Sequence, residues 1–508
     1  MITDAEFAEL KAENAELKQQ VQYLMEQLKL AKHQQFCPSS EQTPPKQLSL
    51  FNEAEALADP AAPEPEIETI KSYRRRKAGQ IGLDRLPDDL PVEEIVHELP
   101  PEEQSCPDCG NPLHVMGREE REELKFVPAK AVIVRHVSHT YACRHCEKHS
   151  DHVPIVKAPM PAPVIKGSFA SPEAIAHIAY EKFVMGSPLY RQEQDWKRKD
   201  IPLSRQTMAN WLIRATNDWL MPIYDRLKEL LLEHQVLHGD ETTLQVLHED
   251  GKTAAQKSYM WVYRTGCDAK RHIVIFEYQP DRKAVRPVEF LDTFEGYLHA
   301  DGYSGYHNLK KEITVVGCWA HARRKFFDII KTMSKEKRAG TQAMRGVQFC
   351  DLLFKLEEDF AKLLPDDNYK ARYEARLEKS KPVVEEFYAW CQGLDVMPRT
   401  SMGKAVGYAQ DQRFWLEHFL LDGRLEISNN RAENAIRPFV CGRKNWLFAN
   451  SEKGAKASAV LFTLIETAKT NGINPFDYLT RVFKTAPNCN FSSDQSLLNS
   501  FLPLTPCI

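Results

Sequence analysis

The chain has 508 residues, of which 43% are hydrophobic, and a formal net charge of −4 at pH 7. This length is enough for three or more domains, and the slight negative charge excludes a histone-like basic protein, so any contact with nucleic acid must come from local basic patches. No apolar run approaches the roughly 18 residues that span a membrane, the N-terminus is unlike a signal peptide, and most of the 12 cysteines are scattered. These features predict a soluble, cytoplasmic protein of a reducing compartment, with no membrane partner.

Residues 1–35 carry a heptad repeat. Its two core positions are occupied by Leu10, Leu17 and Leu24 and by Phe7, Asn14, Val21 and Leu28. The repeat predicts a leucine-zipper-like coiled coil, and an Asn at a core position favours a parallel pair of helices, hence a homodimer or a higher assembly. The alternative is a single amphipathic helix packed on its own chain, because so short a repeat is marginally stable alone.

Residues 36–80 predict a linker followed by a basic arm. The stretch 51–70 has six acidic residues and no basic one, and prolines recur through residues 38–65, which is typical of an unpacked linker. Residues 71–77 then hold five basic residues and no acidic one. This arm is either a solvated surface or a segment that binds DNA phosphates, and its composition favours neither alternative.

Two cysteine pairs mark residues 81–160. The pairs are separated by 33 residues and consist of Cys106, Cys109, Cys143 and Cys146. Four thiolates in two close pairs suit tetrahedral Zn²⁺, so we predict a structural zinc-binding module, with neighbouring histidines as alternative ligands. Between the pairs, residues 131–141 are predicted to form a strand.

Residues 165–234 predict a helical region. Ser171 before Pro172 is typical of a helix start, and Ser204 is the expected cap of a second helix. Residues 191–214 have six basic and three acidic residues. This pattern favours a helix-turn-helix that uses charge for phosphates and amides for base edges; the alternative is an ordinary helical hairpin. The exposed side chains expected to contact DNA are Arg205, Gln206 and Asn210.

From residue 235 onward the pattern changes to strands. Runs over 235–247, 258–265 and 271–278 predict an antiparallel meander, followed by a helix over 282–294, two more strands and a helix over 321–332. This order is typical of an RNase H-like sheet, in which the fourth strand lies beside the first. We therefore expect a multidomain α+β/α/β protein with an RNase H-like core at 235–333, a helical insertion at 334–420, a closing part at 421–486 and a loose tail at 487–508.

Three carboxylates stand out in this core. Asp240 interrupts an apolar, β-prone run, Asp301 ends a short strand, and Glu433 lies near the start of a helix. A carboxylate in a buried strand needs a cation, and hard divalent ions prefer oxygen ligands. Asp301 alone is also explained as a turn residue, and Glu433 as an acid at a helix N-terminus. Together they predict the DDE triad of a metal-dependent nucleotidyltransferase, with Asp240 as the bridge; the neighbouring Glu241 is expected to point to the opposite face.

Basic and sulfur-containing residues accompany the carboxylates. Cys318 and His321 open the helix over 321–332, but alone they lack further metal ligands, so we interpret them as support for the site. Trp446 and Phe448 are candidates for stacking on unpaired bases, although core packing explains each more simply. The basic side chains expected to contact phosphates are Arg323, Arg324, Arg431 and Arg437.

Several segments resemble the IS66-type insertion-sequence transposases over nearly the whole chain. The resemblance rests on the heptad repeat and on the motifs CPDCG, CRHC, GDET, ADGYSGY, CWAHARRKF, SNNRAENAIRP, FANSEKGAKASA and ETAKTNGINPFDYL, in that order. It implies Asp240, Asp301 and Glu433 as the triad, together with the CxxH pair of Cys318 and His321. The residues after about 487 match nothing in this pattern.

The resemblance also implies a bacterial transposase that is nucleoid-associated when bound to DNA. Its expected cofactors are Mg²⁺ or Mn²⁺ at the triad and structural Zn²⁺. Its expected partners are terminal inverted repeats, target DNA and small accessory proteins of the same element. Two alternatives remain at this stage: a non-catalytic DNA-binding protein on a transposase frame, and an RNase H-like nuclease without strand transfer.

Overall fold

The computed structural model describes residues 18, 21, 25, 131–142, 155–331, 333–364, 368–490 and 494–504. Two compact units divide the chain: Pro38–Val137 is one, and Met1–Cys37 with Ser138–Ile508 is the other. The linker, the basic arm and the four cysteines of the predicted zinc module lie outside the described residues. Of the predicted coiled coil, Lys18, Val21 and Met25 are described, and all three are helical and exposed.

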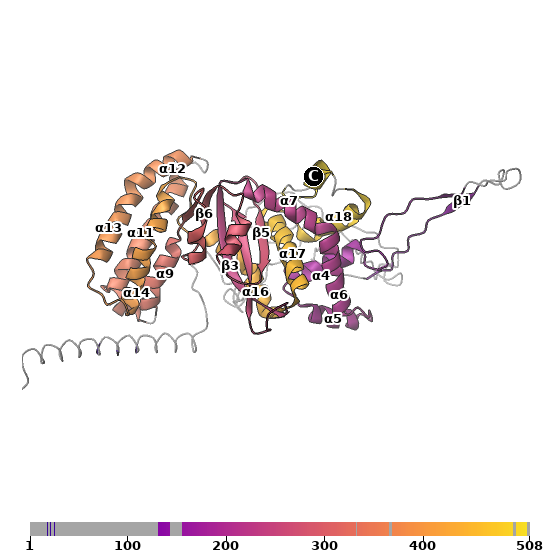
Figure 1. Ribbon diagram of the computed structural model, residues 1–508, viewed down its shortest axis with the longest axis horizontal. Coiled ribbons are helices and arrows are strands. Elements are labelled where there is room, and N and C mark those ends of the chain that lie inside the picture. The colour runs from indigo at the N-terminus through magenta and orange to yellow at the C-terminus, as the bar shows by residue number, and fades with distance from the viewer. Residues whose placement is uncertain are drawn as a thin grey trace, which may run out of the picture. The chain divides into compact units, whose positions relative to one another are not determined.

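A mixed β-sheet forms the centre of the unit that contains Ser138–Ile508 (Figure 1). Its strand order is β5-β4-β3-β6-β7; β4 pairs antiparallel with β3 and β5, whereas β6 pairs parallel with β3 and β7. The predicted meander and the predicted placement of the fourth strand beside the first are confirmed. A short strand, β8 (Ala449–Ser451), pairs parallel with β3 at Val246 and His248, close to the C-terminal end of β3. The five strands are β3 (Val236–His248), β4 (Lys257–Thr265), β5 (Val274–Gln279), β6 (Gly296–His299) and β7 (Ile313–Val316).

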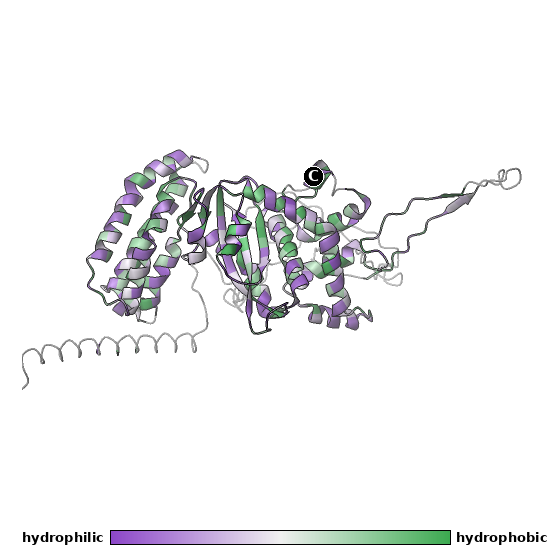
Figure 2. Cartoon of the chain, in the orientation of Figure 1, coloured by the Kyte–Doolittle hydropathy of each residue, from purple (hydrophilic) through white to green (hydrophobic). Residues whose placement is uncertain are grey.

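Helix α17 (Glu452–Thr470) packs against the outer strand of this sheet, and residues 459–468 are buried on every side of the helix. Figure 2 shows hydrophobic residues concentrated in the strands and in α17. An edge strand needs partners for its free backbone groups. Thr467 and Thr463 provide them: their hydroxyl oxygens accept from the backbone N–H of Val274 (3.1 Å) and of Phe276 (2.8 Å). The edge of β5 is therefore closed by helix side chains.

The predicted helical region is present and has the expected caps. The side chains of Ser171 and Ser204 accept hydrogen bonds from Ala174 and Thr207, at the starts of two helices. The region shares its apolar core with the sheet, as in the edge-to-face contact of Phe183 with Phe462. Its helices are α4 (Pro172–Phe183), α5 (Leu189–Arg198), α6 (Arg205–Ala215) and α7 (Met221–Leu232), with a π-helical turn (Thr216–Leu220) between the last two.

The expected helical insertion follows β7 and α9 (Trp319–Ile330). Its described residues contain no strand, and they form an apolar core of their own with α9. The insertion consists of α10 (Lys335–Arg338), α11 (Gln342–Leu363), α12 (Tyr369–Ala375), α13 (Lys381–Gln392), α14 (Ser401–Asp411) and α15 (Arg413–Glu417), with the turns Arg376–Ser380 and His418–Leu420.

Two expectations about the fold are wrong. Residues 131–139 are not a strand: only β1 (Thr140–Ala142) forms there, paired with β2 (Ile155–Lys157). The described part of the tail is not loose, because Phe501 and Leu502 are buried and the Tyr478 hydroxyl donates to the Phe501 carbonyl at 3.0 Å. In the described residues, no helix combines the length and hydrophobicity of a membrane span. The remaining elements are α8 (Val285–Phe290), α16 (Asn430–Trp446), α18 (Pro475–Thr485), the turn Ala486–Asn488 and α19 (Gln495–Ser500).

Candidate active site

Asp240 and Asp301 come from neighbouring parallel strands. His238 of β3 pairs in register with His299 of β6, so each Asp stands two residues beyond that pair. The Asp301 carboxylate accepts a hydrogen bond from the Tyr303 backbone N–H at 2.9 Å. Asp301 therefore also acts as a turn residue, which was the alternative explanation for an Asp at this position. Asp240 accepts from the N–H of Glu241 at 2.8 Å. The pairing of β3 with β6 thus brings these two residues, 61 positions apart in the sequence, to neighbouring positions beyond the same pair of histidines.

Glu433 reaches the same region from the first turn of α16. Burial raises the pKa of Asp240 well above its usual range, and the charges of Glu241, Asp301 and Glu433 raise it further. Like charges disfavour the ionised form of a carboxyl group. The charges of Asp301 and Glu433 therefore reach Asp240, and a bound cation would offset this repulsion.

Glu241, which was expected to point to the opposite face of β3 from Asp240, is linked to Asp301 through Arg282. Its carboxylate accepts from Arg282 Nε at 2.6 Å and from the Tyr306 hydroxyl at 2.8 Å, and Arg282 Nη2 also lies 3.9 Å from Asp301. Burial and the charge of Asp301 raise the pKa of Glu241. Strand β6 has ended at His299, so the loop that follows is free to bring Asp301 toward Arg282. Arg282 follows β5 by three residues and carries no sequence pattern that could have singled it out.

A buried polar network of His238, His299, Glu426 and Asn429 lies next to the site. The rings of His238 and His299 are stacked at 4.3 Å, and both residues are fully buried. His238 Nε2 lies 3.0 Å from a Glu426 carboxylate oxygen, and the Glu426 N–H donates to His299 Nε2 at 3.2 Å. Asn429 contacts His238 Nδ1 at 3.1 Å and donates to the Gly239 carbonyl at 2.8 Å. The network therefore connects β3, β6 and the segment before α16, which lie next to the three carboxylates in the chain.

Glu426 carries the negative charge of this network. Burial alone would raise its pKa, but the hydrogen bonds and charges of His238 and Arg431 outweigh burial and hold the pKa well below the usual range. Arg431 Nε donates to Glu426 at 2.6 Å. The guanidinium of Arg431 is thus engaged inside the protein, although it was predicted to contact DNA.

Cys318 and His321 lie beside Glu433. Cys318 is the N-cap residue of α9, and His321 is in the first turn of that helix. The His321 Nδ1 atom is 3.7 Å from Glu433 Oε1, while Arg324 Nη2 is 3.5 Å from Glu433 Oε2. Burial raises the pKa of the Cys318 thiol to about 11. His321 of the predicted supporting pair therefore lies close to Glu433, a residue of the predicted triad.

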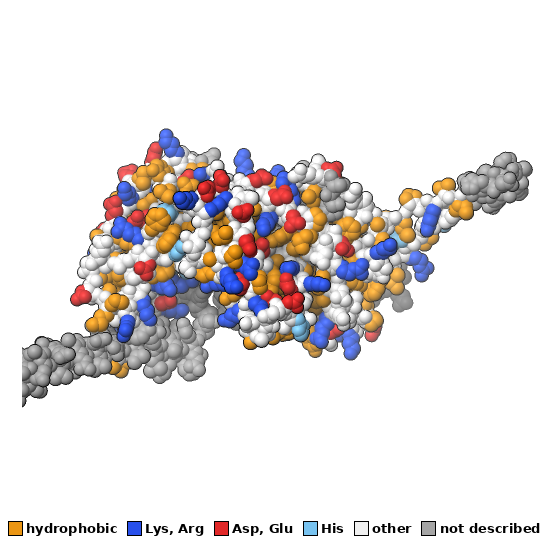
Figure 3. Space-filling view, viewed as in Figure 1, with side chains coloured by type: hydrophobic (Ala, Val, Ile, Leu, Met, Phe, Trp, Pro, Cys, Tyr) orange, Lys and Arg blue, Asp and Glu red, His pale blue; other side chains and the backbone are white. Residues whose placement is uncertain are grey.

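The other residues predicted to bind DNA differ in availability. Arg205, Gln206 and Asn210 are all exposed on α6, as expected. Arg323 instead pairs with Asp351 of α11 at 2.5 Å, whereas Arg324 is exposed and Arg437 is half-buried. On the face shown in Figure 3, basic and acidic side chains are interspersed, in keeping with a weakly negative chain.

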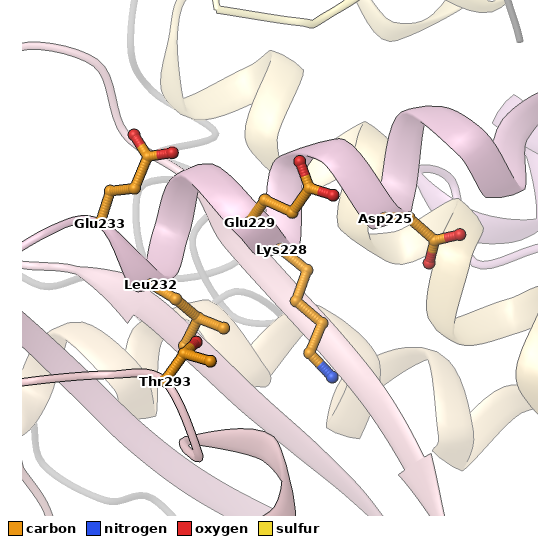
Figure 4. Close-up of a pocket in the computed structure, with 6 residues that line it drawn as sticks. All are labelled: Asp225, Lys228, Glu229, Leu232, Glu233 and Thr293. Carbon is orange, nitrogen blue, oxygen red and sulfur yellow. The ribbon is translucent and has the colours of Figure 1, made fainter. Parts of the chain in front are cut away.

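A surface pocket of about 570 Å³ lies elsewhere, against the outer face of α7 (Figure 4). Its walls include a Lys and three acidic side chains, and Lys228 is already placed 3.5 Å from Glu277 and over the ring of Phe290 at 4.2 Å. None of the carboxylates described above lines this pocket. Its lining residues are Asp225, Lys228, Glu229, Leu232, Glu233 and Thr293.

Comparison with known proteins identifies the family of the chain. A family model described as transposase IS66 family matches residues 167–457, and one described as zinc-finger binding domain of transposase IS66 matches residues 103–147. The family's leucine-zipper model, described as transposase C of IS166 homeodomain, matches residues 23–95. The IS66 C-terminal element matches residues 463–503, so the expectation that the tail matches nothing is also wrong.

Curated relatives cover most of the chain. The uncharacterized protein y4hP of Sinorhizobium fredii is 31% identical over 82% of this chain and 75% of its own length. The uncharacterized protein y4qI of the same organism is 33% identical over 81% of this chain and 74% of its own length. Together with the four model matches, which extend from the zipper to the tail, these similarities show that the chain belongs to the IS66 family of transposases.

Proposed function

We propose that this chain is a DDE transposase with an RNase H-like catalytic core, which cleaves DNA at the terminal inverted repeats of an IS66-type element and joins the ends to target DNA. The observation that supports the proposal most is that the charges of Asp301, which follows β6, and of Glu433 on α16 both act on Asp240 of β3. A plain structural role does not explain it, because clustered carboxylates repel one another in a folded protein.

The chemistry of these donors fits a hard divalent cation such as Mg²⁺ or Mn²⁺. Asp240, Asp301 and Glu433 would hold it, with Asp240 as the shared ligand, since all three offer carboxylate oxygens. Such ions, when bound, activate the attacking water or 3′-hydroxyl and stabilise the leaving oxygen. Burial of Asp240 among other acids supports this assignment, because a cation would remove the repulsion that raises its pKa.

The remaining side chains of the site position the DNA in this proposal. Arg324 is exposed beside Glu433 and is suited to contact a phosphate next to the reacting bond. Arg282 balances Glu241 and Asp301 at the opposite side of the cluster. The exposed residues of α6 would read the repeat, and Arg437 lies on the same helix as Glu433.

Assembly on DNA extends the proposal to the rest of the chain. We infer that Zn²⁺ is bound by Cys106, Cys109, Cys143 and Cys146, because the zinc-finger model of the family spans these four residues. The heptad repeat would pair two protomers so that two element ends are held together, and small proteins of the same element would assist them. Pairing of ends favours strand transfer over simple nuclease action.

The test is an assay with a labelled terminal-repeat fragment, target DNA and Mg²⁺ or Mn²⁺. We expect the wild-type chain to cut at the repeat end and to join it, and expect Asp240→Asn, Asp301→Asn and Glu433→Gln each to lower the rate by at least about 10³-fold. Glu277→Gln is the matched control, since Glu277 is a half-buried carboxylate of the same sheet outside the cluster. Repeat-specific binding without cleavage in all proteins would favour a non-catalytic DNA-binding protein, and cleavage without joining would favour a nuclease.

A further inference from the structure

A second kind of metal ligand set lies against the carboxylate cluster. Cys318, His321 and Glu433 each offer one ligand atom, and these atoms all lie within 4.8 Å of one another. The set combines a thiolate donor, an imidazole and a carboxylate, which is a soft and borderline set rather than the all-oxygen set that Mg²⁺ prefers. The sequence alone supplied only two of the three ligands, because Glu433 is 112 residues from His321.

The two facing polar atoms of this set have no other partner. His321 Nδ1 and Glu433 Oε1 are buried and accept or donate no hydrogen bond, and they are 3.7 Å apart. That separation is too long for a hydrogen bond, but it is close to the edge of a tetrahedron with metal–ligand bonds of about 2.0–2.2 Å. Buried polar atoms without partners are rare in folded proteins and call for an ion or a water between them.

Burial raises the pKa of the free Cys318 thiol, and backbone N–H groups around the sulfur act against that shift. The Asn429 backbone N–H donates to Cys318 Sγ at 3.2 Å, and Cys318 stands at the N-terminus of the 12-residue helix α9. N–H donors and a helix N-terminus both stabilise a thiolate, the form that binds a metal. The other Glu433 oxygen, Oε2, faces Arg324, so the carboxylate divides its two oxygens between a cationic side chain and this ligand set.

We propose that Cys318, His321 and Glu433 bind Zn²⁺ in a site of their own, separate from the four-cysteine module and adjacent to the DDE cluster. The fourth position of a tetrahedral ion would be open to water. Binding through Oε1 would fix the rotamer of Glu433, so that Oε2, which faces Arg324, would be the oxygen that remains for a cation at the DDE site. This consequence rests on the proposed function, whereas the zinc site itself does not.

The experiment counts zinc in the purified full-length chain, without DNA. We expect about two Zn²⁺ per wild-type chain and about one per chain in Cys318→Ser and in His321→Gln. Each substitution removes one ligand from a site that needs all of its ligands to bind zinc. The variant with Cys106, Cys109, Cys143 and Cys146 all changed to Ser should also retain about one Zn²⁺, held at the proposed site. Cys441→Ser is the matched control, because Cys441 is another free cysteine on the Glu433 helix and should not change the count.

Cobalt substitution gives a second readout that does not depend on the count. In the four-cysteine variant, Co²⁺ should produce a thiolate-to-cobalt absorption band that disappears on adding Cys318→Ser. His321→Gln guards against misfolding at the buried cysteine, since His321 is partly exposed. A four-cysteine variant that is folded, free of zinc and without the cobalt band would overturn the proposal. If the wild-type chain retains both zinc ions but shows no strand transfer, that result would count against the proposed function alone and not against the zinc site.

Discussion

Glu426 is the residue through which the two histidines behind the carboxylates are held in place. It accepts from Arg431 and contacts His238, while its backbone N–H donates to His299. Its carboxylate is ionised in the folded protein at a pH where an ordinary glutamate, with a pKa of 4.5, would be half protonated. This single charge therefore stabilises the contact between β3, β6 and the segment before α16.

The pH dependence of stability follows from that lowered pKa. Because the folded-state pKa lies below the unfolded one, the stabilisation by Glu426 is fully present above about pH 4.5 and is lost as the pH falls toward the folded-state pKa. Glu426→Gln should lower the free energy of unfolding at pH 7 by about 3 kcal/mol, since it leaves buried partners unpaired. Urea unfolding at several pH values measures this. The difference from wild type should shrink below pH 4.5, and a constant difference would contradict the argument; the exposed Glu385→Gln is the control.

Arg282 is expected to compete with metal ions for the carboxylates. Its guanidinium contacts Glu241 and lies 3.9 Å from Asp301, so Arg282→Ala removes a positive charge from the edge of the cluster. In the absence of DNA, we expect Mn²⁺ to bind this variant several-fold more tightly, by about 1 kcal/mol. Titration calorimetry measures the affinity. Arg286→Ala is the matched control, because Arg286 pairs with Asp281 instead; equal affinities in all three proteins would show that Arg282 does not compete.

Residue types in the sequence singled out the three carboxylates together with Cys318 and His321, but not the buried network of His238, His299 and Glu426. Asp240 was visible because it interrupts an apolar run. His238 lies in the same run, but a lone His there is equally consistent with simple burial, and Glu426 lies in a polar segment without periodicity. Their association depends on contacts across more than 180 positions, which no local pattern encodes.

At the scale of elements, a buried arginine joins two helical segments of the insertion and also contacts the chain that follows it. Arg376 is fully buried, donates to both oxygens of Glu357 on α11 at 2.7 Å, and donates to the Leu425 carbonyl at 2.6 Å. It also donates to the carbonyls of Phe419 and Asp422, each at 3.0 Å. Arg376 therefore helps to hold the chain between the insertion and α16.

Removing this side chain should destabilise the protein strongly. Arg376→Ala leaves Glu357 buried without its main partner, which is expected to cost about 3–5 kcal/mol. Lys362→Ala breaks an exposed pair with Glu358 on the same helix, α11, and is expected to cost less than about 1 kcal/mol. Thermal unfolding of both variants provides the comparison. Similar losses would mean that the buried pair contributes no more than a surface pair.

Helix α6 is the element expected to recognise the repeat. Gln206→Ala and Asn210→Ala should each reduce the preference for the repeat over unrelated DNA by about 1–3 kcal/mol, while Arg205→Ala should weaken binding to both sequences equally. Competition binding at fixed salt measures the two effects. Lys456→Ala on α17, another exposed basic residue, is the control. Unchanged preference in both amide variants would favour an ordinary helical hairpin.

At the scale of the whole molecule, periodicity predicted most elements and their order. The strands were predicted correctly because the alternation of apolar and polar residues is a local signal. The helix caps were predicted correctly because a Ser before Pro, or before a helical run, is also a local signal. The strand predicted over residues 131–141 was too long, because a β-prone composition does not guarantee a partner strand along its whole length. The packed tail was missed because Phe501 gains its burial only from distant residues. The insertion was identified as helical, but its own core with α9 could not be foreseen.

The central claim is that Asp240, Asp301 and Glu433 form one cation site, and site-directed radical cleavage tests it most directly. Fe²⁺ is bound to the zinc-loaded protein in place of Mg²⁺, and ascorbate with peroxide then cuts the backbone close to the bound iron. The account predicts three cuts, near Asp240, Asp301 and Glu433, that excess Mg²⁺ suppresses and Asp240→Asn abolishes. Cuts at only one of these positions, or cuts that Mg²⁺ does not suppress, would contradict it.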